Sequence, residues 1–447
     1  MKGISATKKN CSTSSSDHNL HSKRIKISSN SSKTNITDLP DFLLVEILCR
    51  LPCKKFIFQC KLVSNRWCTL LSDLYFIGRF LCLQSETPIK RTMINSEGEE
   101  IPKFSKPLTR LFKRLMSFHS LEKEPVVLGT YNDLVLCSAT EDYQRDYYIC
   151  NPYTTKWVPV PPPPQVYQYL PVGLVCDFPY YNYNHKKDDW KGHDDIIHVN
   201  AEYRCKIVRI LPFKKKSEYG SFYFKVETFS FETGEWRVSI VSSPRGFDFY
   251  DICADISFMY NGMLCWPSDV MGSDHNFIIG LDPFMMEDNN STSTTDGDDI
   301  TDRYECCFFR LVEENEMCHI VDFLGVSQGC PRMCDLSGHS LYVWELKEAQ
   351  DQMAGSNRAG KLRLIHPRVY SLDQNMFQDE EITLLHFDPN VKDSLYLRVN
   401  NDIAKCNIST GKWSRIAPSN SIYSWHFFPS TELPWPTPVP RLLQHVH

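Results

Sequence analysis

Four residues of the sequence have types that bind metal ions: the adjacent Cys318 and His319, and Cys330 and Cys334. Structural zinc sites usually hold two pairs of ligands that are each two to four residues apart, and a directly adjacent Cys-His pair does not fit this spacing. We therefore interpret the cysteines as reduced, mostly buried thiols and expect no metal and no other cofactor. The sequence also has no G-x-G-x-x-G, P-loop, H-E-x-x-H or EF-hand pattern, and we expect no nucleotide, metalloprotease or hydrolase chemistry.

Length and charge limit the classes of protein to consider. A chain of 447 residues exceeds the roughly 250 to 300 at which one core stops growing, so more than one folded unit is expected. The net charge of −5 is uneven, because residues 1–36 carry +6 and the remainder −11. An acidic body without a basic stripe argues against nucleic acid as a partner. The sequence has no apolar run of membrane-spanning length and no secretory signal, so we expect no membrane and a place in the nucleus, the cytoplasm or both.

The elements that follow the polar N-terminal residues are predicted to be helices. Apolar residues recur at the spacing of one helix face in two runs: Leu44, Ile47, Leu48 and Leu51, then Val63, Trp67, Leu70 and Leu71. Asp38 and Ser64 are placed to cap these helices, Pro40 falls in the first turn, and Pro52 stops the first helix.

This helical unit of about 40 residues has more apolar side chains than its own core can use. The surplus consists of residues that cannot all face inward on three short helices: Leu39, Pro40, Ile47, Leu48, Leu51 and Pro52. An exposed apolar patch of this kind marks a protein interface. Trp67 fits the core of the unit as well as it fits an interface, and both readings stay open here.

The stretch "LPDFLLVEILCRLP", followed by "KLVSNRW", resembles an F-box, the motif by which substrate-recognition subunits bind the Skp-type adaptor of cullin-RING ubiquitin ligases. The resemblance implies a set of adaptor-binding residues: Leu39, Pro40, Ile47, Leu48, Leu51, Pro52, Val63 and Trp67. It also implies that cullin and RING subunits are reached through the adaptor. The segment "CKKFIFQCK" departs from the usual pattern, which leaves the contacts of Phe56 and Phe58 open.

Beyond about residue 125 the sequence changes to short β-rich runs separated by turn residues, so this half is predicted to be all-β. Three hairpin-like segments share one pattern: "YICNPYTTKW", "ETFSFETGEW" and "AKCNISTGKW". Their tryptophans, Trp157, Trp236 and Trp413, are separated by distances near two and four units of 40 to 44 residues, the period of propeller blades. "YNDLVLC" near Asn132, "YNGMLCW" near Asn261 and "SGHSLYVW" support the same period.

The body resembles the F-box-associated, kelch-like β-propeller region of plant F-box proteins, with "NPYTTKWVPVPPP" as a familiar kind of segment. The expected fold class is α+β multidomain, a small all-α F-box followed by an all-β domain that we expect to be a β-propeller. The expected domains are a disordered basic tail (1–36), the F-box (37–80), a linker (81–124), the substrate-recognition propeller (125–430) and a Pro-rich tail (431–447).

The expected function is that of a non-catalytic subunit of an SCF-type ubiquitin ligase, which binds an unknown protein substrate through the β domain. Two alternatives stay open. A propeller-type glycan-processing enzyme would use carboxylates around the central channel, although the S-x-D-x-G-x-x-W repeat of sialidases is absent. An F-box scaffold without ligase activity shares every sequence feature with the favoured interpretation.

Overall fold

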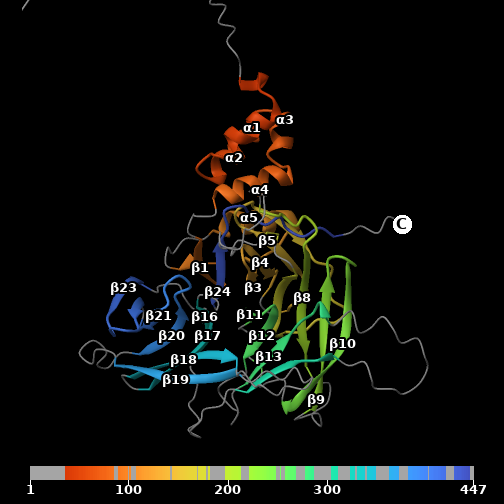
Figure 1. Cartoon of the computed structure of the whole chain (residues 1–447). Helices are drawn as coiled ribbons and strands as arrows, with labels where there is room; N and C mark the ends of the chain where they lie inside the picture. Colours follow the sequence, from red (N-terminus) through yellow and green to blue (C-terminus); the bar gives the residue numbers. More distant parts are fainter. Residues whose placement is uncertain are drawn as a thin grey trace, which may run out of the picture.

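The computed structural model describes residues 36–442 with internal gaps. The gaps are 85–88, 99, 102–106, 141–142, 169, 178–179, 182–196, 213–220, 248–251, 253–256, 268–276, 286–303, 311–322, 328–329, 338–339, 349–361, 372–380, 401 and 419–426. Figure 1 shows a small helical unit standing on a ring of β-sheets.

Four short α-helices and one 3-10 turn make up the helical unit: η1 (Ile36–Asp38), α1 (Asp41–Leu48), α2 (Lys54–Cys60), α3 (Asn65–Leu70) and α4 (Leu74–Leu83). Ser64 caps α3 as expected, because its hydroxyl accepts a hydrogen bond from the Trp67 amide at 3.2 Å. The expected cap at Asp38 is wrong, since α1 begins at Asp41 and Pro40 occupies the N-cap position.

The β region is a propeller of five blades, and in each blade successive strands pair antiparallel. The first and second blades are β3 (Val126–Tyr131), β4 (Leu134–Ser138), β5 (Tyr147–Asn151) and β6 (Lys156–Pro159), then β7 (Val172–Asp177), β8 (Arg204–Leu211), β9 (Ser221–Ser230) and β10 (Glu235–Phe247). The third blade is β11 (Phe258–Tyr260), β12 (Met263–Pro267), β13 (Phe277–Leu281) and β15 (Cys307–Arg310). The fourth and fifth are β16 (Phe323–Ser327), β17 (Cys330–Ser337), β18 (Ser340–Glu348) and β19 (Leu362–Ser371), then β20 (Ile382–Phe387), β21 (Ser394–Val399), β22 (Asp402–Asn407) and β23 (Trp413–Pro418). The short strand β14 (Tyr304–Glu305) pairs parallel with β10 at the outer edge of the second blade.

A three-stranded sheet completes the ring between the fifth and first blades. It contains β2 (Glu100–Ile101), β1 (Lys90–Asn95) and β24 (Phe427–Glu432), with Lys90 opposite Glu432. The expectation of a linker over 81–124 is therefore wrong: this range holds the end of α4, β1, β2 and helix α5 (Thr109–His119), which packs on the first blade. Strands from both ends of the β region close the ring by pairing, so neither end is a free edge.

Apolar side chains fill each junction around the ring. Representative pairs, in ring order, are Ile149 with Leu174, Phe224 with Trp266, Ile278 with Trp344, Leu341 with Leu395, Met93 with Leu385, and Phe428 with Val135. The β region therefore has six apolar cores, one between each pair of neighbouring sheets. This is the packing of a closed propeller.

The three tryptophan segments are equivalent in strand pairing, but they are not separated by whole multiples of one blade length. Trp157, Trp236 and Trp413 lie on the fourth strands of their blades and pair with Cys150, Phe229 and Cys406, each seven positions earlier. The turns contain residues with positive φ, at Thr155, Gly234 and Gly411. All three tryptophans are half-buried.

The expected unit of 40 to 44 residues is wrong. Trp157 and Trp236 lie on neighbouring blades and Trp236 and Trp413 lie three blades apart, because long connections lengthen the blades. Asn132 and Asn261 occupy equivalent turns between the first two strands of the first and third blades, both with positive φ. The segment "SGHSLYVW" spans the turn between the second and third strands of its blade and is not equivalent to them.

The expected basic tail lies outside the described residues over 1–35. Of the Pro-rich tail at 431–447, residues 431–442 are described, and they lie along the propeller on the side of the helical unit (Figure 1). In the part of the chain that the structure describes, no helix has the length and apolar character needed to cross a membrane.

Candidate functional site

The first helix of the helical unit is apolar on two faces. Leu44, Val45 and Leu48 are buried in the core of the unit, whereas Phe42 and Ile47 are 67% and 48% exposed. An eight-residue helix can bury only one face against its own small unit, so the outer face is left to solvent.

The eight residues that the sequence assigned to adaptor binding divide by exposure. Pro40, Ile47, Pro52 and Val63 are exposed, and Leu39 and Leu51 are half-buried. The last two, Leu48 and Trp67, are in the core, at 4% and 6% exposure. The six exposed or half-buried residues can therefore contact a partner directly. Leu48 and Trp67 belong to the core on which these residues pack.

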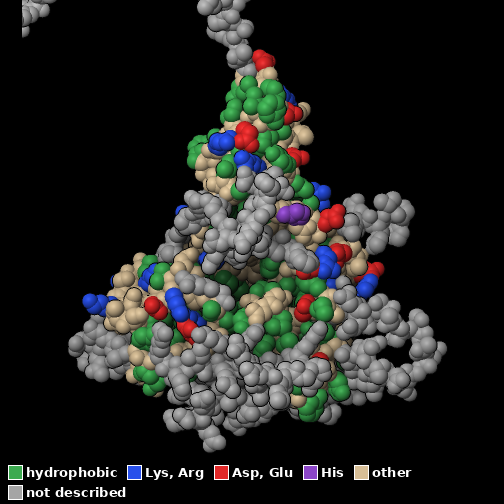
Figure 2. All heavy atoms as spheres, in the orientation of Figure 1, with side chains coloured by type: hydrophobic (Ala, Val, Ile, Leu, Met, Phe, Trp, Pro, Cys, Tyr) green, Lys and Arg blue, Asp and Glu red, His purple; other side chains and the backbone are tan. Residues whose placement is uncertain are grey.

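Other exposed apolar side chains enlarge this surface. Five further side chains are exposed: Phe56, whose contacts the resemblance left open, and four that are not among the predicted adaptor-binding residues, Ile36, Phe42, Leu43 and Leu62. Figure 2 shows hydrophobic side chains gathered over the outer end of the helical unit. The signal was present in "DFLLVEIL", because a short helix with apolar residues on every side has a face that its own fold does not bury. We call the exposed set Ile36, Pro40, Phe42, Leu43, Ile47, Leu62 and Val63 the apolar surface.

Arg66, on α3, holds the segment that carries Leu39 and Pro40. Its guanidinium donates to the carbonyls of Thr37 and Leu39, both at 2.6 Å, and to the Asp41 carboxylate at 2.7 and 2.9 Å. One planar side chain thus ties the turn before α1 to α3. The apolar surface is preorganised at this end by a polar contact.

Charged groups lie beside the apolar surface on α1 and α4. Glu46 forms ion pairs with Arg50 at 2.8 Å and with Arg79 at 3.4 Å. The hydrogen bond from Arg50, aided by the charge of Arg79, lowers the pKa of Glu46. The carboxylate therefore stays ionised at neutral pH, and these pairs form a polar rim of the kind that surrounds apolar interfaces.

The F-box domain family model matches residues 36–77. Residues 36–77 are an F-box domain. Two F-box proteins of Arabidopsis thaliana are similar to the chain: one is 25% identical over 226 residues, 51% of this chain and 48% of the relative, and the other is 24% identical over 250 residues, 53% of each. The chain spans about half the length of these relatives.

Among solved structures, one from a study of two prolyl endopeptidases is 10% identical and covers 64% of this chain and 40% of that chain. Its TM-score is 0.27, which is too low to support an argument about fold or activity.

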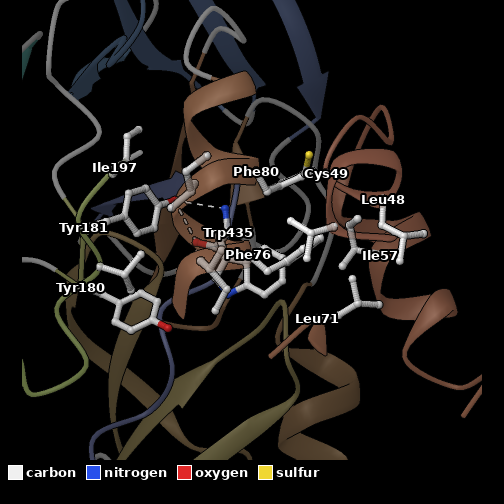
Figure 3. Close-up of a cluster of buried hydrophobic side chains, with 14 of the residues drawn as sticks. Leu48, Cys49, Ile57, Leu71, Phe76, Phe80, Tyr180, Tyr181, Ile197 and Trp435 are labelled. Carbon is white, nitrogen blue, oxygen red and sulfur yellow. Dashed lines mark hydrogen bonds between the residues drawn. The ribbon is translucent and has the colours of Figure 1, made fainter. Parts of the chain in front are cut away.

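The F-box is joined to the propeller by an aromatic cluster around Trp435 (Figure 3). The ring centroid of Trp435 lies 5.6 Å from that of Phe58 on α2 and 5.7 Å from that of Phe80 on α4. Lys61 lies over the same ring at 5.2 Å. Trp435 is 5% exposed, so the C-terminal segment supplies part of the core of an F-box that is small on its own.

Polar contacts fix the other side of this joint. The Tyr181 hydroxyl donates to the Trp435 carbonyl at 2.9 Å and accepts from the Trp435 amide at 3.1 Å. Lys54 on α2 donates to the Leu433 carbonyl at 2.7 Å and pairs with Glu432 at 3.5 Å. The joint therefore connects F-box helices, the C-terminal segment and a segment between β7 and β8.

Asp133 anchors the C-terminal segment to the first blade. Its carboxylate accepts from the Thr437 amide at 2.8 Å and from the Asn151 side chain at 2.9 Å. The Asn151 amide also donates to the Thr437 carbonyl at 2.7 Å. Complete burial raises the pKa of Asp133 from 3.8 to about 6, although these hydrogen bonds oppose the rise.

This raised pKa predicts a stability that falls as pH rises. Between about pH 4 and pH 6 native Asp133 keeps a proton that the unfolded chain has lost, so the free energy of unfolding declines through this window. We expect the wild type to lose about 2 to 3 kcal/mol relative to Asp133→Asn between pH 4 and pH 7. Urea denaturation of both proteins across this range measures the difference. A difference that does not change with pH contradicts the prediction.

The expectation that the sequence offers no hydrolase motif is wrong. Residues 325–329 have the pattern G-x-S-x-G of hydrolase nucleophile elbows. An elbow lies between a strand and a helix, whereas Ser327 lies in β16, which is followed by the antiparallel strand β17. Ser327 is 2% exposed and its hydroxyl donates to the Asp388 carbonyl at 3.1 Å. The described residues around Ser327 therefore do not reproduce the elbow.

The metal-like residues are not brought together as a set. Cys318 and His319 lie outside the described residues, and Cys330 and Cys334 lie on β17 as free thiols. Cys334 is buried as expected, whereas the expectation is wrong for Cys330, which is exposed at the start of the strand. No group of three or more His, Cys, Asp or Glu in the described ranges is placed to hold a metal ion.

Proposed function

We propose that this chain is a substrate-recognition subunit of an SCF-type ubiquitin ligase. The F-box binds a Skp-type adaptor, and through the adaptor the chain joins the cullin and RING subunits. The chain itself is non-catalytic, because ubiquitin transfer uses the RING subunit and a conjugating enzyme. The propeller binds a protein target, which is ubiquitinated and degraded by the proteasome, in the nucleus, the cytoplasm or both.

The apolar surface of the F-box is the observation that supports this proposal most directly. Seven large or rigid apolar side chains stay exposed on a unit that already has a filled core. Burial of apolar area on a partner is the main favourable term in association, and aromatic and aliphatic anchors such as Phe42 and Ile47 dominate it.

Titration calorimetry of the full chain with a purified Skp-type adaptor tests the proposal. We expect one-to-one binding with a negative heat-capacity change, the signature of apolar burial. Reconstitution with cullin, RING, activating and conjugating enzymes then measures ubiquitin transfer to the chain itself. An adaptor that does not bind contradicts the proposal, and binding without any transfer supports the scaffold alternative.

The Arg66 contact predicts a smaller effect on adaptor affinity. Arg66→Ala releases the carbonyls of Thr37 and Leu39, so the turn that carries Pro40 must be ordered again on binding. We expect affinity to fall by about five- to tenfold. The free energy of unfolding should change by less than about 1 kcal/mol, because the Arg66–Asp41 pair is solvent-exposed. Arg66→Lys is the matched variant that keeps the charge, and it should restore little affinity because an ammonium cannot make the planar set of contacts.

Affinity purification identifies the target. A form without residues 37–80 cannot pass its target to the ligase. It should therefore retain the target and accumulate more of it than the full chain does.

A propeller-type glycan-processing enzyme is the remaining candidate of another class, and screening the purified chain for glycan cleavage tests it.

A further inference from the structure

Helix α5 is amphipathic and lies on the first blade just below the F-box (Figure 1). Leu111, Phe112 and Leu115 are buried against the blade. The opposite face is exposed and carries Arg110, Lys113, Arg114, Ser117 and Phe118. The propeller therefore presents one complete helix face to solvent.

The exposed face of α5 has an unbalanced positive charge. Arg110 lies three residues before Lys113 and four before Arg114, the separations at which like charges on a helix repel. The helix contains no Asp or Glu, and none of these three cations forms an ion pair with a carboxylate in the described part of the chain. This concentration of charge stands out in a body with a net charge of −11 beyond residue 36.

The positive surface continues onto the neighbouring hairpin. Arg114 donates to the Thr155 hydroxyl at 3.1 Å and lies 5.4 Å from the Trp157 ring. Lys156 lies between Thr155 and Trp157 in the chain and is exposed. The pKa of Lys61 on the F-box is lowered mainly by burial, and the positive charge of Lys156 lowers it further. The positive surface of α5 therefore continues through Lys156 toward the F-box.

An exposed aromatic side chain accompanies these cations. Phe118 is 74% exposed and lies edge-on to Trp157 with ring centroids 6.0 Å apart. Phe118 is not part of the core below α5, and a large exposed apolar side chain offers an anchor to a partner.

We propose that the outer face of α5, with Lys156 and Phe118, is a docking site for an acidic protein segment that carries a large apolar side chain. Carboxylates of the segment pair with Arg110, Lys113 and Lys156, and the apolar side chain packs on Phe118. The eleven residues of α5 are about 16 Å long, which about five residues of extended chain can follow. The site lies on the propeller, so it does not depend on adaptor binding.

A protein segment fits this site better than a nucleic acid does. The cations occupy one short helix and one hairpin, whereas nucleic-acid binding uses basic groups along an extended track of phosphates. A longer polyanion would also meet the acidic remainder of the body, which would repel it.

Fluorescence anisotropy with the full chain tests the site without adaptor. The probe is a labelled peptide with four acidic residues on each side of a Leu-Phe pair. Arg110→Glu with Lys113→Glu should weaken its binding at least about tenfold at low salt. The helix should remain folded in this variant, because Glu at position 110 is placed to pair with Arg114 four residues later. Thermal unfolding checks this.

The matched control makes the same change of charge elsewhere on the propeller. Lys225→Glu with Arg237→Glu alters two exposed cations on β9 and β10 and should leave the affinity within about twofold. A peptide with Gly-Ser in place of Leu-Phe should bind more weakly than the probe. The proposal is overturned if the probe does not bind, if the control variant loses as much affinity as the α5 variant, or if an oligothymidine of equal charge binds more tightly than the peptide.

Discussion

Replacing Phe42 and Ile47 together with Ser lowers the affinity for a Skp-type adaptor by at least about 100-fold, which is the largest effect we expect on binding. Both side chains project from the outer face of α1, where they are 67% and 48% exposed, so the free protein gains little from them. In a complex they would be covered, and each truncation then removes apolar burial and leaves a gap in the interface.

The same exposure makes this prediction easy to separate from misfolding. The free energy of unfolding of the double variant should change by less than about 1 kcal/mol, since neither side chain contributes to the F-box core. Phe222→Ser with Val238→Ser is the matched control, because these residues are equally exposed on the second blade, at 54% each. Adaptor binding that survives in the α1 variant, or that is lost equally in the control, contradicts the proposed interface.

Replacing Trp435 with Ala costs about 3 to 5 kcal/mol of folding free energy and loosens the F-box from the propeller. The ring is almost fully buried among Phe58, Phe76 and Phe80, so its removal leaves a cavity between them. The backbone hydrogen bonds with Tyr181 are kept in the variant, so the loss measures the aromatic contact. Urea denaturation measures the cost.

Amide hydrogen exchange locates the effect. We expect faster exchange in α2 and α4, which contact Trp435, while the blades are unchanged. Trp413→Ala is the control, because this half-buried ring packs against the core between the fourth and fifth blades, and that core contains no F-box residue. Protection of α2 and α4 that is the same in both variants means that the C-terminal segment does not hold the F-box.

The F-box was predictable because its information is local. The spacing of Leu44, Leu48 and Trp67, the cap at Ser64 and the prolines lie within one short stretch, and helix periodicity reads such patterns directly. The same locality explains the hairpins of Trp157, Trp236 and Trp413: a turn with positive φ sets the register of the strands that flank it.

The division of the F-box residues into core and surface was less predictable. Leu48 and Ile47 are adjacent and equally apolar, yet one is buried and the other exposed. In a helix that is apolar on every side, periodicity shows which residues share a face. It does not show which face packs against the rest of the unit.

By itself, the amino-acid sequence determined the F-box helices, the β hairpins and the all-β character of the body, since each depends on residues close together in the chain. Only the tertiary structure decided how many blades form, that β1 pairs with β24 to close the ring, and that Trp435 completes the F-box core. These contacts join residues more than 300 positions apart. They form between apolar surfaces that are still exposed, and complementary in shape, once the local elements have formed. No short-range spacing of residues in the sequence encodes such a fit.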